Sequence, residues 1–384
     1  MAQDRAAPGA ARAALKVVHV LAETGFSGGE GQLQLILEHL RAQGHDNVVV
    51  LHPGARFADT ARQLGARVHF VPLRRWWRPD LWPRLRAILR RERPDVLHFA
   101  CGRALLVGGL CAVGATARVK LTIRRIDYPV RRGPFGWNRY RLFVDHTVAI
   151  CDAIVDRLRA AAVPGDRITR IYDGIDPAPW LGLERQRAAA RAALGVPQGA
   201  QLVTQVGVLR PRKGQHVLLA AFAQLASDFP AARLFLAGGG TELERLRRQA
   251  GDLGLEDRVH LPGAVRPIQN VYAASDIFCM PSFHEGLCNA CLEASFAGLP
   301  QVVSSAGGNA EIVDDGATGS VVPPGDAAAL AAALRPYLAD PALRAAHGAA
   351  GRARSLERFT ADRLGAELEQ LFQDLVRRSP GGAR

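Results

Sequence analysis

The fold is decided by residues 277–304, which read IFCMPSFHEGLCNACLEASFAGLPQVVS. Two short apolar runs, 277–280 and 301–304, have the length and composition of buried β-strands. The residues between them read as an amphipathic helix that begins near Gly286. A strand, a helix and a second strand in this order are typical of a parallel βαβ unit. This stretch therefore predicts an α/β domain.

The same alternation extends outward in both directions. Earlier strands are expected at 16–21, 47–51, 67–71, 95–99, 118–123 and 146–149. The pattern restarts after YDGIDPAPW (172–180) and a polar helix at 184–193, with strands at 201–208, 232–237, 259–261, 277–280, 301–304 and 319–322. We predict two doubly wound, Rossmann-like domains, 14–178 and 179–384. The last helix, about 361–377, has an apolar face that must pack on a neighbour, and the N-terminal domain is one candidate.

Composition excludes several classes of protein. The 384 residues are 48% hydrophobic and 22% charged, which argues against disorder, collagen and a small disulfide scaffold. The uncharged apolar stretch 104–117 is shorter than the ~20 apolar residues of a membrane span and reads as a buried helix. We find no secretory leader, and the six cysteines show no paired framework. We therefore expect a cytoplasmic protein with reduced thiols.

The positive charge is concentrated in the N-terminal half. Residues 1–178 contain 28 Lys and Arg against 16 Asp and Glu, whereas residues 179–384 contain 21 against 20. Either this surface simply keeps the protein in solution, or the N-terminal half meets an anionic membrane, a phosphorylated acceptor or a nucleic acid. The cluster Arg74, Arg75, Trp76, Trp77, Arg78 and Trp82 suits a lipid headgroup region, unless its tryptophans pack inward.

Two glycine-rich loops follow predicted strands, at 23–40 and 234–246. Neither completes the G-x-G-x-x-G dinucleotide fingerprint, since Gln34 occupies the third glycine position in the first loop. Both still offer backbone N–H groups to an anion, and a tight turn without a ligand is the alternative, more so for the second loop than for the first.

The loop after the 201–208 strand holds Arg210, Arg212 and Lys213 in an otherwise neutral domain. Three cations in four residues suit a pyrophosphate, although an ordinary solvated loop remains the alternative.

Glu285 and Glu293 lie eight positions apart. If a helix joins them, they are up to ~12 Å apart along its axis, which exceeds the separation of glycosidase carboxylates. They are better placed at opposite ends of a long polar ligand, such as a sugar–diphosphate–ribose unit, unless they are surface acids. Cys288 and Cys291 have no second Cys or His pair nearby, which argues against zinc or redox chemistry.

The segment Pro281 to Asp326 resembles the signature of GT4-type retaining glycosyltransferases of the GT-B fold. Further matches are Gly28-Gly29-Glu30, DVLH (95–98), AICDAIVDRL (149–158), YDGID and VGVLRPRKG. The members that build lipopolysaccharide core or other cell-surface glycans are the most similar. The resemblance implies two domains facing a cleft, a nucleotide-diphosphate sugar as donor, a glycan or lipid-linked acceptor, and no metal or other cofactor.

The resemblance also implies roles for individual residues. Glu285 would contact the donor sugar, and Glu293 the ribose hydroxyls. Arg210 and Lys213 would bind the diphosphate and stabilise the leaving nucleotide. The remaining donor-site residues are Gly28, Gly29, Gly207, Leu287, Cys288 and Asn289, which would act through close approach or backbone N–H groups.

Three positions depart from the family pattern. Val208 stands where many relatives have Arg, so we expect Arg210 to serve instead. The N-terminal domain lacks the usual histidine after its fifth strand, and the acceptor-side candidates become His98, Arg124, Arg125 and Asp127. Asp173 replaces the usual Asn, which we expect to matter little.

We predict a metal-independent retaining glycosyltransferase of the cytoplasm, acting in lipopolysaccharide or other cell-envelope polysaccharide synthesis. It could contact the inner face of the cytoplasmic membrane. The alternatives are a GT-B-fold epimerase or phosphorylase and, from another class, a basic nucleic-acid-binding protein. The latter is suggested only by the sequence pI of about 10.3 and has no recognition motif. Neither the donor, the acceptor nor the oligomeric state can be predicted from the sequence.

Overall fold

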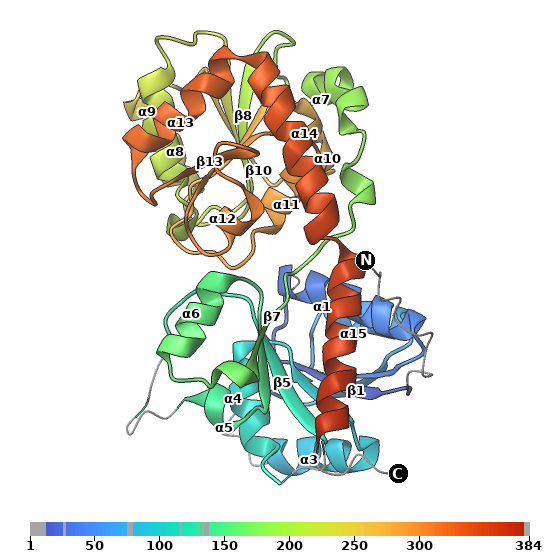
Figure 1. Cartoon of the computed structure of the whole chain (residues 1–384). Helices are drawn as coiled ribbons and strands as arrows, with labels where there is room; N and C mark the ends of the chain where they lie inside the picture. The colour runs from blue at the N-terminus through green and yellow to red at the C-terminus, as the bar shows by residue number, and fades with distance from the viewer. Residues whose placement is uncertain are drawn as a thin grey trace, which may run out of the picture.

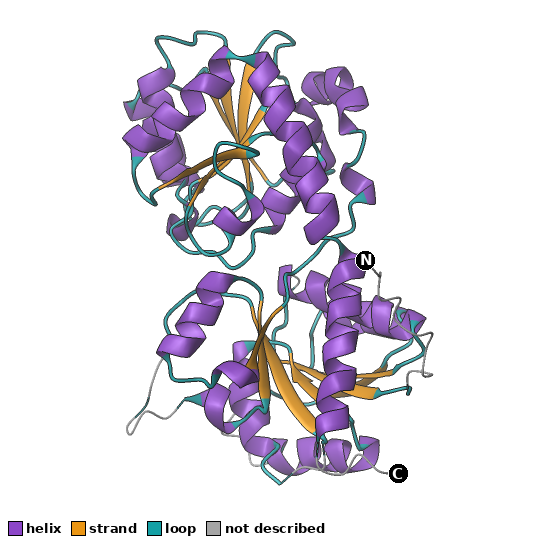
Figure 2. Ribbon diagram, in the orientation of Figure 1, coloured by secondary structure: helices purple, strands orange, loops and turns teal. Residues whose placement is uncertain are grey.

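The computed structural model describes residues 13–25, 28–74, 80–114, 117–130, 133 and 138–379. They form two α/β domains, one above the other, each with a parallel sheet and helices packed around it (Figures 1 and 2). This arrangement confirms the predicted fold class.

The N-terminal domain contains a sheet of seven parallel strands in the order β3-β2-β1-β4-β5-β6-β7. Its strands are β1 (Lys16–Leu21), β2 (Asp46–Leu51), β3 (Arg67–Phe70), β4 (Val96–Phe99), β5 (Val119–Arg124), β6 (His146–Ala149) and β7 (Ile168–Arg170). Its helices are α1 (Gly28–Ala42), α2 (Phe57–Gln63), α3 (Leu81–Glu92), α4 (Gly102–Cys111), α5 (Arg139–Leu142) and α6 (Asp152–Ala160). The short edge strand β7 was missed because its three residues carry no apolar run.

The C-terminal domain contains a sheet of six parallel strands in the order β10-β9-β8-β11-β12-β13. Its strands are β8 (Gln201–Val206), β9 (Ala232–Ala237), β10 (Val259–Gly263), β11 (Ile277–Met280), β12 (Gln301–Ser304) and β13 (Gly319–Val322). Its helices are α7 (Arg187–Ala193), α8 (Gln215–Leu225), α9 (Leu243–Asp252), α10 (Gln269–Ala274), α11 (Asn289–Phe296), α12 (Asn309–Ile312), α13 (Ala327–Ala339) and α14 (Pro341–Arg358).

The segment that predicts the fold forms β11, α11 and β12. Its helix begins at Asn289, however, with Cys288 in the N-cap position. Glu285 and Gly286 therefore lie in the loop before the helix, and the prediction that a helix opens at Gly286 is wrong. A strand end that turns with Pro281 and Gly286 needs several residues before helical backbone can start.

The last helix, α15 (Ala361–Arg378), leaves the C-terminal domain and runs along the N-terminal one (Figure 1). Leu364, Leu368 and Phe372 are buried on the face that packs against α1. Glu369 is buried beside His39 of α1, with 3.0 Å between its Oε2 and the His39 Nε2.

The chain thus crosses between the domains twice, and the two crossings touch. Ile175 of the first crossing and Thr360 of the second form a parallel β-bridge. Gly174 is pressed so closely against this bridge that a Cβ there would lie 2.2 Å from the Thr360 carbonyl oxygen.

The stretch 104–117 forms most of α4, which is largely buried. Among the described residues, no helix combines the length and the apolar character needed to cross a bilayer. Of the tryptophan cluster, Arg75, Trp76, Trp77 and Arg78 lie outside the described residues, and Trp82 is partly exposed at the start of α3.

Candidate active site

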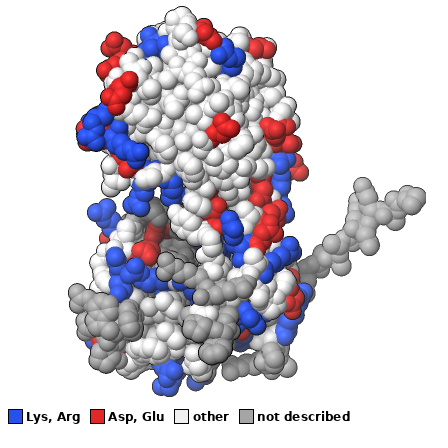
Figure 3. Space-filling view, turned by 90° about the vertical axis from the view of Figure 1, so that its left-hand side faces the viewer, with Lys and Arg blue, Asp and Glu red and all other residues white. Residues whose placement is uncertain are grey.

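A cavity of about 560 Å³, the central cavity, lies between the two domains, at the carboxyl ends of their strands. The N-terminal domain and the linker after it line it with Gly28, Gly29, Arg125, Ile126, Ile150 and Asp173. The C-terminal domain lines it with Val206, Gly207, Val208, Arg212, Lys213, Glu285, Gly286, Leu287, Cys288, Asn289, Ala290 and Glu293. Figure 3 shows the hollow between the domains, with charged side chains gathered around it.

The loop after β8 supplies the cations of this cavity. Its 3-10 turn, Pro211–Lys213, directs the Lys213 ammonium to Glu285 Oε1, with which it forms an ion pair. Arg212 Nη1 lies 3.8 Å from the second oxygen of Glu285. Burial alone would lower the pKa of Lys213, but the neighbouring Cys288 and Glu285 raise it overall. Lys213 is therefore charged at neutral pH.

Arg210 does not join these residues. Its side chain is exposed at the residue preceding the turn, and it is absent from the cavity lining, where Arg212 stands instead. The turn reverses the chain between Arg210 and Lys213, so that spacing along the sequence does not translate into convergence.

Glu285 lies in the loop between β11 and α11, where it is held firmly. Ser282 Oγ donates a hydrogen bond of 2.8 Å to the same oxygen that Lys213 contacts. Gly286 follows it at the boundary between the domains, where a Cβ would lie 2.2 Å from the carbonyl oxygen of Arg125. The glycine thus permits the N-terminal domain to reach the cavity wall.

Glu293 lies one turn into α11 and is the second acid of the cavity. It accepts a hydrogen bond from the Tyr272 hydroxyl. Burial raises the pKa of Glu293 to about 7, which outweighs the lowering effect of Tyr272. The site therefore holds a carboxyl group whose pKa lies near neutral pH.

The N-terminus of α11 lies between the two acids. Cys288 caps it without a side-chain hydrogen bond, and the first amides of a helix have no partner within the helix. Leu287, Cys288 and Asn289 all line the cavity, beside the N-terminus of α1. A Cβ on Gly28 would lie 3.4 Å from Asn289 Nδ2, so the two helix N-termini meet closely. Such positive helix ends favour an anion between them.

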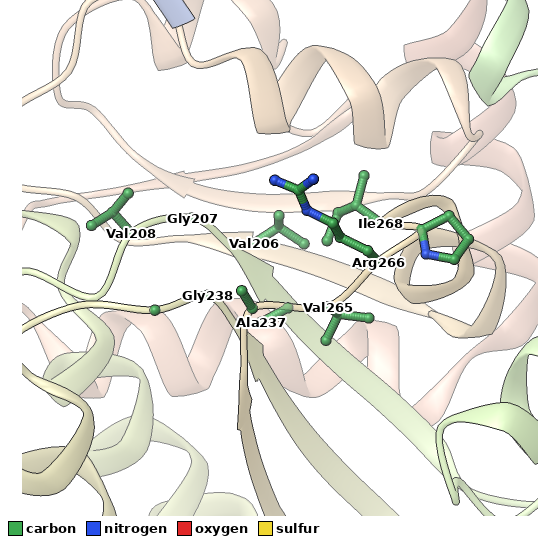
Figure 4. A pocket seen from close by; sticks show the side chains of 11 residues that line it. Val206, Gly207, Val208, Ala237, Gly238, Val265, Arg266 and Ile268 are labelled. Carbon is green, nitrogen blue, oxygen red and sulfur yellow. The ribbon is translucent and has the colours of Figure 1, made fainter. Parts of the chain in front are cut away.

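A second cavity of about 830 Å³ continues from Val206, Gly207 and Val208 (Figure 4). It lies at the ends of β8, β9 and β10. Its further lining residues are Ala237, Gly238, Gly239, Ala264, Val265, Arg266, Pro267 and Ile268. The walls are mainly apolar, and Arg266 adds a guanidinium group. This composition suits a flat, partly polar ring system.

A third cavity, the front cavity, of about 470 Å³, lies within the N-terminal domain. Its lining includes Glu23, Glu30, Arg124, Arg139 and Tyr140, and it shares Gly29, Arg125 and Ile126 with the central cavity. Two of the acceptor-side candidates, Arg124 and Arg125, are therefore brought together here.

The other two candidates lie elsewhere. His98 is fully buried inside the sheet, where its Nδ1 is 3.0 Å from Nδ1 of His19 on the adjacent strand β1. Burial holds the pKa of His98 well below its usual range, so it is a neutral core residue. Asp127 points to the C-terminal domain, with 3.4 Å between its Oδ1 and Nδ1 of His284. Neither residue lines the front cavity.

The sequence analysis counted Arg212 only as one of three cations in its loop, and it expected Asp173 to matter little. Asp173 forms an ion pair with Arg125, with 2.9 Å between Oδ2 and Nε, and both line the central cavity. The signal in the sequence was that positions 125 and 173 both depart from the family pattern, with an Arg at the first and an acid at the second.

Comparison with known proteins identifies the family. Two family models match, "Glycosyl transferases group 1" over residues 186–354 and "Glycosyltransferase Family 4" over residues 26–179. The lipopolysaccharide core biosynthesis glycosyltransferase LpsE of Rhizobium meliloti is 32% identical over 262 residues, 68% of this chain and 70% of that protein. The chain belongs to this glycosyltransferase family. The predicted family is thereby confirmed.

One further relative and one solved structure extend the comparison. A GDP-mannose-dependent phosphatidylinositol monomannoside mannosyltransferase of Mycolicibacterium smegmatis is 34% identical over 227 residues, 56% of this chain but only 59% of that relative. The crystal structure of Anabaena HepE in complex with UDP superposes with a TM-score of 0.82 at 22% identity, covering 94% of this chain and 100% of that one. The latter likeness shows the GT-B fold.

Within the described ranges, no three His, Cys, Asp or Glu side chains are grouped so that they could hold a metal ion. The positively charged side chains that line the central cavity are Arg125, Arg212 and Lys213.

Proposed function

We propose that this glycosyltransferase moves a sugar, with retention of anomeric configuration and without a metal, from a nucleotide-diphosphate sugar to a glycan or glycolipid acceptor. The pathway we propose is the synthesis of lipopolysaccharide or another cell-envelope polysaccharide, in the cytoplasm. The relatives named for lipopolysaccharide core synthesis support the pathway.

One observation carries the proposal. Arg212 and Lys213 come from the loop after β8, and Glu285 and Glu293 come from the β11–α11 loop and α11 itself, yet all four line a single cavity between the domains. A nucleotide sugar needs cations for its diphosphate and polar groups for its sugar and its ribose. This cavity offers both kinds of group.

The diphosphate of the donor would lie at the N-terminus of α11, against Lys213 and Arg212. Negative charge grows on this group as the bond to the sugar breaks, and fixed cations stabilise it in the transition state. Because Lys213 is already held by Glu285 and Ser282 lies behind that acid, little reorganisation is needed during the reaction. Glu285 would contact the donor sugar, next to the N-terminal domain.

The nucleoside would extend from Glu293 into the second cavity. Carboxylate oxygens accept hydrogen bonds from the two ribose hydroxyls, and the apolar walls around Val206, Val265 and Ile268 suit a base (Figure 4). Attack by the acceptor on the same face from which the nucleotide leaves would retain the configuration. In that case the departing phosphate takes the acceptor proton, and no protein nucleophile is required.

The decisive experiment measures thermal stability with UDP-, GDP- and ADP-sugars, followed by product analysis with the donor that binds. A bound donor at 100 times its dissociation constant stabilises the fold by about 2.7 kcal/mol. The transferred linkage should have the donor's configuration by NMR, and a chelator should leave the rate unchanged. An inverted product would reject the retaining mechanism, and the absence of any transfer would reject the function.

We also propose that the N-terminal domain rests on an anionic membrane surface. Helix α3 carries Arg84, Arg86, Arg90 and Arg91, and Trp82 at its start is 37% exposed. Arginines and tryptophans of this kind favour anionic headgroups. Vesicles containing phosphatidylglycerol should sediment the protein at low salt, whereas phosphatidylcholine vesicles should not. Equal sedimentation with both kinds of vesicle would contradict the electrostatic contact.

A further inference from the structure

We infer that the front cavity binds an acceptor sugar that carries an oxyanion, a phosphate or a carboxylate, beside the hydroxyl that receives the transferred sugar. This inference rests on the proposed function, because it names the chemical class of the acceptor for the same reaction.

The position of the front cavity suits the acceptor. Its walls are formed where β1, β4 and β5 end, the edge at which parallel sheets bind ligands. Gly29, Arg125 and Ile126 line both this cavity and the central one. A ligand in the front cavity is therefore next to the site proposed for the donor sugar.

Two arginines in this wall each have a buried N–H group without a hydrogen-bond partner among the described residues. Arg124 is 5% exposed, and it donates to the Tyr140 hydroxyl and to the Tyr128 carbonyl. Its Nε is buried and has no hydrogen-bond partner among the described residues. Arg125 donates from Nε to Asp173, while its buried Nη2 likewise has no described partner. Buried donors without a partner are rare in native proteins, so these two N–H groups need an explanation, and an acceptor group of a bound ligand or an ordered water is one.

The rest of the lining matches an acidic sugar better than a neutral one. Arg139 adds a third guanidinium from α5, and Nη1 of that side chain donates to the Gly102 carbonyl at 3.0 Å. Guanidinium groups bind phosphate and carboxylate oxygens in pairs. The opposite wall, after β1 and on α1, presents Glu23 and Glu30, and carboxylates accept hydrogen bonds from sugar hydroxyls. One wall thus suits the oxyanion and the other the hydroxyls.

The test compares three probes, glucose 6-phosphate, glucuronate and glucose, by calorimetric titration at matched ionic strength. We expect at least one of the acidic probes to bind tenfold or more tightly than glucose, and the better of the two identifies phosphate or carboxylate. Equal binding of all three would overturn the inference.

Variants assign the binding to the front cavity. Arg139→Ala should weaken binding of the acidic probe at least tenfold. The double variant Arg125→Ala with Asp173→Asn should have the same effect, because it removes both members of the ion pair and leaves no unpaired buried charge. Arg86→Ala is the matched control, because Arg86 also donates to a backbone carbonyl, that of Cys111, but lies outside the cavity. Equal loss in the control, or no loss in the first two, would overturn the inference.

Lys213→Ala separates the two proposals. It should abolish stabilisation by the nucleotide sugar and leave binding of the acidic probe unchanged. If Lys213→Ala instead removes the acidic probe, the anion binds in the donor site and the inference fails. If no nucleotide sugar stabilises the wild type while the acidic probe binds as expected, the proposed function fails and the anion site remains.

Discussion

The central cavity and the front cavity treat their charges in opposite ways. In the central cavity, Glu285 already engages Lys213, Ser282 and Arg212, so its charge is balanced before any ligand arrives. In the front cavity, Arg124 and Arg125 retain buried N–H groups that no described residue accepts. The central cavity is therefore preorganised before a ligand binds. In the front cavity, we infer that the ligand supplies the missing hydrogen-bond acceptors.

The strongest way to break this comparison is to remove its central acid. Glu285→Ala should abolish sugar transfer, because it removes the contact to the donor sugar and releases Lys213 and Arg212 from their partner. Thermal unfolding should show an intact fold, and Glu244→Ala, an exposed acid on α9, should keep full activity. Normal turnover in the Glu285 variant would reject the assignment.

The cation loop provides the second test. Lys213→Ala should lower kcat by about 10²- to 10³-fold, the usual cost of losing one group that stabilises developing negative charge. Arg210→Ala, three residues earlier but exposed, should change kcat less than about twofold. A loss with Arg210→Ala as large as that with Lys213→Ala would show that the loop rearranges around the donor.

The acid at the ribose end predicts a pH effect. Because the pKa of Glu293 is raised to about 7 and ribose hydroxyls favour its charged form, nucleotide binding should release a proton. Affinity should fall by up to about tenfold per pH unit below pH 7 and become constant above about pH 8. Calorimetry of UDP or GDP binding between pH 6 and 8 measures this slope, which Glu293→Gln should flatten. An equal slope in that variant would assign the proton to another group.

The smallest expected effect concerns the junction of the domains. Gly365→Ala would place a Cβ 2.3 Å from Cγ of His39, so overpacking between α15 and α1 should lower the free energy of unfolding by about 1–3 kcal/mol. Gly31→Ala, on α1 in open space, is the matched control and should be stabilising by up to about 1 kcal/mol. Denaturant unfolding compares the two. If both changes are stabilising, α15 is not closely packed.

The strands could be predicted because burial of both faces of a parallel sheet demands continuous apolar runs. β1, β6, β9, β11, β12 and β13 have the predicted bounds. The edge strand β7 carries no such requirement and was missed. The start of α11 was misplaced because the chain turns through Pro281 and Gly286 before helical backbone begins at Asn289.

The candidate site could be predicted only where a motif fixes the backbone. Glu285 and Lys213 belong to two such motifs and meet in the cavity. Arg210 precedes a 3-10 turn and Arg212 lies within it, and residue spacing does not determine which of the two reaches the cavity. His98 resembles a site residue in sequence, yet both faces of β4 are buried and His98 is buried with them. The contact between Arg125 and Asp173 depends on tertiary folding, and its only signal in the sequence is that both positions depart from the family pattern.

The two adjacent crossings affect how this molecule is made. A ribosome produces the strands of the N-terminal domain first, and domains generally fold as they emerge. The helix that covers α1, however, is synthesised only after the entire C-terminal domain. Until then the apolar face of α1 lacks its cover, including the surface beside His39. The first domain to begin folding is therefore the last to be finished.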